Sequence, residues 1–220
     1  MSKLYGISVG PGDPELMTIK AKKILDNCRV VATPVTKGDK TLALDIAKGI
    51  ISLDDKEILR LEFLMSRDKK AIDANHRENA DRIIDYLKAD KDVAMLNLGD
   101  ASLYSSFSYI ADIVIKKGYE VEVVPGVTSF CAAAAKLNTS LTEMNKPLHI
   151  FPGAIIDDTI ELNGTKVLMK SGKKIKEVKE KLSGCDVMAV QNCGLKNEKI
   201  CITLEDIDDD ATYFTTLLIK

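Results

Sequence analysis

The stretch YGISVGPGDPELMT, residues Tyr5–Thr18, decides the fold of this chain. An apolar run typical of a buried strand stops at Gly-Pro-Gly-Asp-Pro, and a helix-like segment begins directly after it. Gly10 and Gly12 lack a Cβ and can adopt positive φ, so a ligand can approach the backbone closely. Pro11 fixes its own φ and stiffens the loop. Open α/β sheets bind small molecules at such junctions, so the stretch predicts an α/β fold with a binding site nearby.

The composition is that of an ordinary globular protein. The 220 residues are 45% hydrophobic and 29% charged, with a net charge of −2. This charge gives no general attraction to nucleic acid or to acidic membranes. No apolar run approaches the roughly 20 residues that span a bilayer, and the first residues lack a signal-peptide pattern. We therefore expect a cytoplasmic protein that binds neither nucleic acid nor membrane.

Cysteine and histidine are spaced unlike metal ligands. The five cysteines are an odd number for a disulfide framework, and Cys185, Cys193 and Cys201 follow one another at intervals of eight residues, which matches no short zinc motif. One of the two histidines, His149, lies in an apolar run where a strand residue is expected. We expect reduced thiols and no metal site.

Strand and helix patterns alternate through the first half of the chain. Strands are predicted at residues 4–9, 29–32, 92–98 and 120–124, and helices at 15–27, 41–51, 68–88 and 107–117. Strands joined by helices of this length imply right-handed crossovers and a mostly parallel sheet.

The pattern changes after Val127. A small-residue helix at 129–137 precedes strand-like runs at 148–151, 165–169, 185–191, 198–203 and 212–219, with one clear helix at 175–182. We therefore predict two α/β domains, residues 1–126 with a mostly parallel sheet and residues 127–220 with a mixed sheet. A cofactor is expected in the cleft between the domains.

Three loops follow predicted strands at their carboxyl ends. They are Gly10–Pro14, Leu98–Tyr104 and Val124–Phe130. The carboxyl ends of parallel strands lie along one edge of a sheet, so we expect the three loops to lie together. One Gly-rich turn is a weak signal, but three turns on one edge indicate a binding site.

Together, these loops resemble those of the tetrapyrrole methylases, S-adenosylmethionine-dependent enzymes of cobalamin and sirohaem biosynthesis. That family shares an opening motif G-x-G-P-G-D-P-x-L-x-T, a central Gly-Asp loop and a Pro-Gly-Val/Ile loop. The resemblance covers nearly the whole chain. Leu98–Ser105, Pro125–Phe130 and Leu64–Asp68 look most like the branch that methylates C20 of precorrin-2 or cobalt-factor II. One departure is Ala101, where the family usually has proline; it loosens the loop but removes no polar group.

The resemblance implies a set of residues that line the S-adenosylmethionine site: Pro11, Leu98, Gly99, Asp100, Leu103, Ser129, Phe130, Met169, Asn192, Cys193 and Thr215. The Gly99–Leu103 segment should contact the methionine part, through the Asp100 side chain or through backbone groups. Asp100 could also cap the next helix. Met169 should lie beside the adenine, or could simply fill the core. Pro11 should shape the wall on the substrate side.

Asp13 and Tyr104 are the candidate catalytic residues. Asp13 could accept a hydrogen bond from a pyrrole N–H, or cap the helix that follows it. Tyr104 could orient the substrate through its hydroxyl, or pack against a helix. Either could remove the C20 proton, and nothing in the sequence selects one. Basic side chains that could bind the substrate carboxylates, or could simply be solvated, are Lys37, Lys40, Arg60 and Arg67.

The implied reaction transfers a methyl group to C20 of cobalt-factor II or precorrin-2 and leaves S-adenosylhomocysteine. Family members are typically homodimers. Three alternatives stay open: a methylase for another corrin position, a diphthine synthase-like enzyme, and a non-catalytic module that binds S-adenosylmethionine or a nucleotide. A nicotinamide-dependent oxidoreductase is disfavoured, because the opening loop has no third glycine at the G-x-G-x-x-G spacing.

Overall fold

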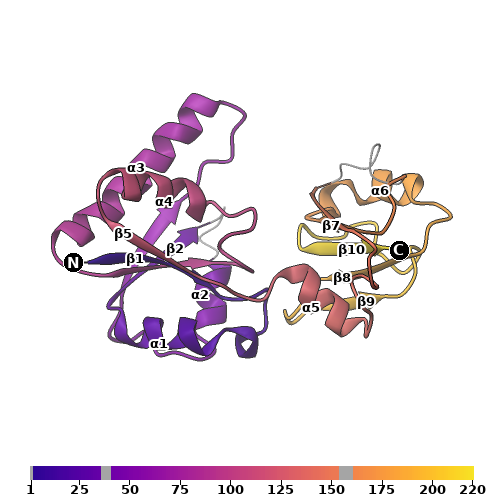
Figure 1. Cartoon of the computed structure of the whole chain (residues 1–220), viewed down its shortest axis with the longest axis horizontal. Coiled ribbons are helices and arrows are strands. Elements are labelled where there is room, and N and C mark those ends of the chain that lie inside the picture. Colours follow the sequence, from indigo (N-terminus) through magenta and orange to yellow (C-terminus); the bar gives the residue numbers. More distant parts are fainter. Residues whose placement is uncertain (1, 36–40, 154–160) are drawn as a thin grey trace. The chain divides into compact units, whose positions relative to one another are not determined.

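The computed structural model describes residues 2–35, 41–153 and 161–220, which form two compact units (Figure 1). The units are Met1–Val127 and Thr128–Lys220. Thr128 is also the N-cap of the first helix of the second unit, and its side chain accepts a hydrogen bond from the backbone N–H of Cys131.

The first unit is built on a five-stranded sheet with the order β3-β2-β4-β1-β5. The strands are β1 (Lys3–Ser8), β2 (Val30–Val35), β3 (Glu57–Glu62), β4 (Val93–Asn97) and β5 (Glu120–Val124). All four strand pairings are parallel, as predicted. Because β4, β1 and β5 are neighbours, the loops that follow them leave the sheet side by side at one edge.

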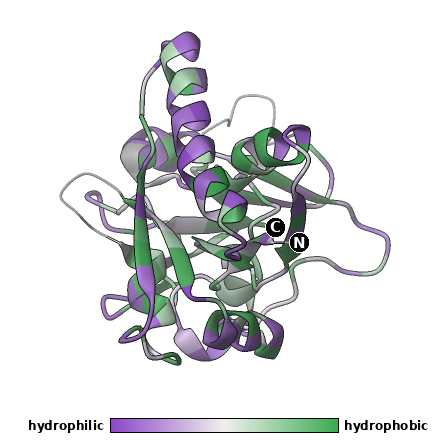
Figure 2. Cartoon of the chain, turned by 90° about the vertical axis from the view of Figure 1, so that its left-hand side faces the viewer, coloured by the Kyte–Doolittle hydropathy of each residue, from purple (hydrophilic) through white to green (hydrophobic). Residues whose placement is uncertain are grey.

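Helices cover both faces of this sheet. Figure 1 shows α3 (Lys69–Lys88) and α4 (Phe107–Lys116) on one face, and α1 (Ile19–Asn27) and α2 (Leu42–Ala47) on the other. The side chains alternate along β1 accordingly, so that Leu4 packs in the core under α3 and α4 while Ile7 packs in the core over α1 and α2. Figure 2 shows hydrophilic residues recurring along α3, as expected for a helix with one solvent face.

Strand β3 was not predicted. Its sequence EILRLE buries Leu59 and Leu61 while Arg60 is exposed, which is the period of two of an edge strand. The predicted end of β2 before Pro34 was also wrong. β2 continues to Val35, because its pairing with β4 stops at Ala32 and Pro34 lies where only β3 is paired. Proline is tolerated at such edge positions.

The second unit has a mixed sheet, as predicted, with the order β6-β7-β10-β8-β9. The strands are β6 (Leu148–Pro152), β7 (Thr165–Met169), β8 (Val187–Gln191), β9 (Lys199–Cys201) and β10 (Thr215–Ile219). Only the β6–β7 pair is parallel among these pairings. The amino end of β10 therefore lies between the carboxyl ends of β7 and β8.

Two helices flank this second sheet. Helix α5 (Ser129–Lys136) packs against β10 and β8, and Figure 1 shows α6 (Ile175–Lys181) on the opposite face. The core on the α6 side includes Leu168, Val178 and Leu217. Within the described part of the chain, no helix is both long and apolar enough to cross a membrane.

Candidate functional site

The loop after β1 is fixed by its own side chains. Asp13 Oδ1 accepts a hydrogen bond of 2.9 Å from the backbone N–H of Glu15, and so caps a single 3₁₀ turn, Pro14–Leu16. The long helix predicted from residue 15 begins only at Ile19, where Thr18 is the N-cap. The capping interpretation of Asp13 therefore applies to the 3₁₀ turn and not to α1.

The first two loops are joined by their backbones. Gly10 and Gly99 exchange two hydrogen bonds, with N···O distances of 3.2 Å and 2.8 Å. Both glycines have positive φ, 74° and 71°, which other residues rarely adopt. A Cβ at Gly99 would have no atom within 4 Å, so the space beside this backbone is open.

Asp100 is largely buried, with 9% exposed, and its carboxylate joins the second loop to the third. Oδ2 accepts a hydrogen bond of 2.7 Å from the backbone N–H of Gly126. Oδ1 accepts from the backbone N–H of Ser102 at 2.8 Å and also from the Ser102 hydroxyl. The N-cap of α4 is Ser106, so the idea that Asp100 caps this helix is wrong.

The charge state of Asp100 follows from these contacts. Burial raises the pKa of the Asp100 carboxyl, but the hydrogen bonds from the Ser102 hydroxyl and from the N–H groups of Gly126 and Ser102 outweigh it. The pKa is held below its usual range, so Asp100 is an anion at neutral pH. Its two oxygens accept hydrogen bonds from protein donors, so the carboxylate holds the second and third loops together.

The rest of the second loop carries a strained residue. Tyr104 has φ of 48° and is 46% exposed. Positive φ in a non-glycine residue costs about 1–3 kcal/mol and is enriched at functional sites, although Asp90, Asn138, Met144 and Lys170 also adopt it in this chain. Ser105 links the loop to the end of β4, because its hydroxyl donates to Asn97 Oδ1 at 2.8 Å. Leu103 N–H donates to the Asp100 carbonyl at 3.2 Å.

In the second unit, Met169, Asn192 and Thr215 come together where the three neighbouring strands β7, β8 and β10 have their ends on the same side of the sheet. Met169 ends β7, Asn192 follows β8, and Thr215 begins β10 between them. Asn192 has φ of 52°, and its N–H donates to the Phe214 carbonyl at 2.9 Å. The Thr212 hydroxyl donates to Asn192 Oδ1 at 2.6 Å, so this amide is held in one orientation. No pattern in the sequence singles out Thr212.

The turn that contains Cys193 is held by Glu198. One Glu198 oxygen accepts the N–H of Gly194 at 2.6 Å, and the other pairs with Lys136 of α5 at 3.0 Å. Burial raises the pKa of Glu198, but these two donors outweigh it and the pKa is lowered. The first residues of α5 are Ser129 and Phe130, whose N–H groups have no acceptor within the helix. They can therefore donate to a bound polar group.

The predicted site residues thus fall into two sets, each brought together within its own unit. The first is Pro11, Asp13, Leu98, Gly99, Asp100, Leu103 and Tyr104, and the second is Ser129, Phe130, Met169, Asn192, Cys193 and Thr215. A cofactor cleft between the domains stays a prediction. Of the basic candidates, Arg60 and Arg67 are exposed, and Lys37 and Lys40 lie outside the described residues.

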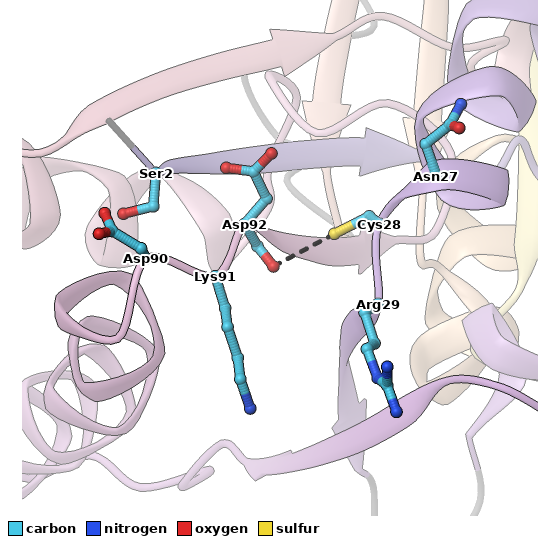
Figure 3. A pocket seen from close by; sticks show the side chains of 7 residues that line it. All are labelled: Ser2, Asn27, Cys28, Arg29, Asp90, Lys91 and Asp92. Carbon is cyan, nitrogen blue, oxygen red and sulfur yellow. Dashed lines mark hydrogen bonds between the residues drawn. The ribbon is translucent and has the colours of Figure 1, made fainter.

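A cavity of about 560 Å³ lies at the amino ends of β1, β2 and β4, at the end of the first sheet opposite the three loops (Figure 3). It is lined by Ser2, Asn27, Cys28, Arg29, Asp90, Lys91 and Asp92. The Cys28 thiol points at the Asp92 carbonyl, 3.3 Å away, and burial raises the pKa of this thiol to about 11. A thiol with such a pKa is a poor nucleophile, so the cavity is separate from the candidate site both in place and in chemistry.

The sequence can now be compared with known proteins. Residues 3–208 match the family described as Tetrapyrrole (Corrin/Porphyrin) Methylases. The chain belongs to the tetrapyrrole methylase family. It is 35% identical to the probable cobalt-precorrin-2 C(20)-methyltransferase of Methanocaldococcus jannaschii, over 100% of this chain and 96% of that protein. It is 30% identical to the cobalt-precorrin-2 C(20)-methyltransferase of Salmonella typhimurium, over 99% and 96%.

A solved tetrapyrrole methylase has the same fold. The structure of a cobalt precorrin-4 methyltransferase superposes with a TM-score of 0.77 at 24% identity, covering 99% of this chain and 94% of that one. Its likeness confirms the predicted arrangement of a parallel and a mixed sheet.

Tetrapyrrole methylases use S-adenosylmethionine, and each unit by itself carries backbone groups of the polar kind that such a ligand needs. Its methionine part carries charged ends that need backbone donors and acceptors, and the open space at Gly99 gives access to the backbone. The N–H groups of Ser129 and Phe130, which have no acceptor within α5, offer further polar contacts. No three His, Cys, Asp or Glu side chains among the described residues are grouped as metal ligands.

Proposed function

We propose that this tetrapyrrole methylase transfers a methyl group from S-adenosylmethionine to C20 of cobalt-factor II in cobalamin biosynthesis. The observation that carries the proposal is 35% identity across the whole chain to a relative named for C20 methylation. The two relatives at 30% identity or more reported above carry names that specify the cobalt-containing substrate, whereas a relative named for precorrin-2 is 26% identical, and this favours cobalt-factor II.

The residues of the site would act chiefly by positioning. S-adenosylmethionine supplies a sulfonium methyl group that is already activated for transfer to a nucleophilic carbon. Since little covalent help is needed, in-line placement of the reacting atoms supplies most of the rate. We propose that Gly99, Asp100 and Leu103 hold the methionine part through their backbone, with Leu98 and Pro11 as flanking walls. The bridge between Gly10 and Gly99 keeps these walls together.

In the second unit, we propose that Ser129 and Phe130 donate N–H groups to polar atoms of the cofactor. Met169, Asn192, Cys193 and Thr215 would line the part that holds the adenosine. Two observations support this. Met169, Asn192 and Thr215 lie at the same end of three neighbouring strands, and the Thr212 hydroxyl holds the Asn192 amide in one orientation.

Proton removal from C20 needs a base, and we propose Asp13 or Tyr104. Asp13 Oδ1 is used by Glu15, and no described donor binds its Oδ2. This oxygen could accept a pyrrole N–H or the C20 proton. Tyr104 is 46% exposed and lies in the same loop as Gly99, so its hydroxyl could orient the tetrapyrrole.

The test is to incubate the purified protein with S-adenosylmethionine and, separately, with cobalt-factor II and precorrin-2. We expect a mass gain of one methyl group, and NMR with ¹³C-methyl donor should place it at C20. Methylation at another corrin carbon, or of neither tetrapyrrole, would contradict the proposal. Asp13→Asn and Tyr104→Phe, compared under saturating donor, would then separate the two candidate bases by their pH–rate profiles.

Two finer properties belong to the same proposal. We infer a homodimer, because family members are typically dimeric. Size-exclusion chromatography with light scattering would measure the mass of the protein in solution, and we expect that of two chains. We infer a cytoplasmic location, which agrees with a biosynthetic role, and fractionation of cells would test it.

A further inference from the structure

Ser8 ends β1, and its side chain is completely buried between β4 and β5. Its hydroxyl donates to the Val124 carbonyl at 2.6 Å and accepts the backbone N–H of Ala101 at 2.9 Å. The roles are fixed, because a carbonyl can only accept and an amide can only donate. One oxygen atom therefore joins three neighbouring strand ends.

This link runs beside the one made by Asp100. Ala101 follows Asp100 in the second loop, and Val124 lies two residues before Gly126 in the third. The same two loops are thus tied twice, once through the Ser8 hydroxyl and once through the Asp100 carboxylate. Packing between them is tight, because a Cβ on Gly126 would lie 2.4 Å from Ser8 Cβ.

Ala101 stands where the family that the loops resemble usually has proline. Proline has no N–H, whereas the buried N–H of Ala101 needs an acceptor. In this chain the Ser8 hydroxyl is that acceptor, so Ser8 compensates for the N–H that Ala101 introduces.

We propose that Ser8 is a positioning residue of the methyl-donor site, paired with Ala101. The inference rests on the proposed function. Ser8 acts through the Ala101 amide to hold the Gly99–Leu103 backbone in its ligand-binding conformation, without touching the ligand. Loss of the hydroxyl leaves a buried amide with no acceptor, which the loop can relieve only by moving.

The test measures calorimetric affinity for S-adenosylhomocysteine in the full chain. Ser8→Ala should weaken binding about tenfold, as expected for one unsatisfied buried amide. Ser2→Ala is the matched control, because Ser2 lies at the other end of β1 and its buried hydroxyl donates to the Leu87 carbonyl at 2.6 Å. Ser2→Ala should lower the melting temperature but leave affinity unchanged.

The double variant Ser8→Ala/Ala101→Pro should bind within about threefold of wild type, since proline removes the orphaned N–H. It should also fold if Ser8→Ala alone does not. Equal affinities of Ser8→Ala and Ser2→Ala for S-adenosylhomocysteine would overturn the positioning role. A double variant that neither binds nor folds better than Ser8→Ala would overturn the pairing with Ala101. Failure of the wild type to bind S-adenosylhomocysteine would refute the proposed function itself, and the inference with it.

Discussion

Replacing Asp100 with asparagine tests whether a charged acceptor ties the loops together. Asparagine keeps the shape but has one oxygen and one NH₂ group. Whichever way it turns, the N–H of Gly126 or that of Ser102 faces a donor instead of an acceptor. A hydrogen bond to a charged group contributes about 1.5–3 kcal/mol, and water at the loop surface restores part of it. We expect a local loss of about 2 kcal/mol.

Hydrogen exchange at the Gly126 amide measures this loss locally. A loss of about 2 kcal/mol corresponds to about 30-fold faster exchange in Asp100→Asn at neutral pH. Asp68→Asn is the matched control, because Asp68 caps α3 by accepting two backbone N–H groups at an exposed position. Asparagine caps as well as aspartate does, so that variant should exchange like wild type at Gly126.

The pH dependence gives a second check on the same reasoning. The pKa of Asp100 is lowered in the folded protein. Its stabilisation is therefore complete above the unfolded-state value of about 3.9, and is lost as pH falls through the lower folded-state value. The difference in stability between wild type and Asp100→Asn should shrink over that acidic range. A difference that does not vary with pH, or equal exchange rates at Gly126, would refute the account.

Three further outcomes are expected. Thr33→Val should raise the unfolding free energy by about 1 kcal/mol in urea titrations, because the buried Thr33 hydroxyl has no hydrogen-bond partner among the described residues; lower stability would contradict this. Gly126→Ala should lower the unfolding free energy by about 2 kcal/mol, since a Cβ there would lie 2.4 Å from Ser8 Cβ and 2.8 Å from the Gly99 carbonyl oxygen; an unchanged melting temperature would argue against it. At pH 8, iodoacetamide should label exposed Cys131 and spare Cys28, whose pKa burial raises to about 11, as read by peptide mass mapping.

The sequence was informative where a pattern is local. The parallel first sheet, the mixed second sheet and most helices follow from periodicity, which neighbouring residues carry. β3 escaped prediction because a half-exposed edge strand mixes Glu57 and Arg60 with its leucines, and such a short run resembles a polar loop. The start of α1 was misplaced because Asp13 and Thr18 are both good caps, and only the fold shows which one begins the long helix.

The partners within the site could not be predicted, because they are distant in sequence. Asp100 was singled out by its motif, but its acceptor role depends on Gly126, which reaches it only because β4, β1 and β5 are neighbours. Thr215 was a candidate only through the resemblance. Its place beside Gln191 follows from the insertion of β10 between β7 and β8, which no short pattern encodes.

These contacts give Asp100 a structural task in the second loop. Its two oxygens accept hydrogen bonds from donors of the second and third loops, so the carboxylate joins these loops. Ser8 likewise uses both its donor and its acceptor capacity inside the protein. The Asp100 and Ser8 side chains therefore hold the loops together, and we expect the loop backbone to contact the ligand. Gly99, with positive φ and open space where a side chain would lie, is the point where that backbone can be approached.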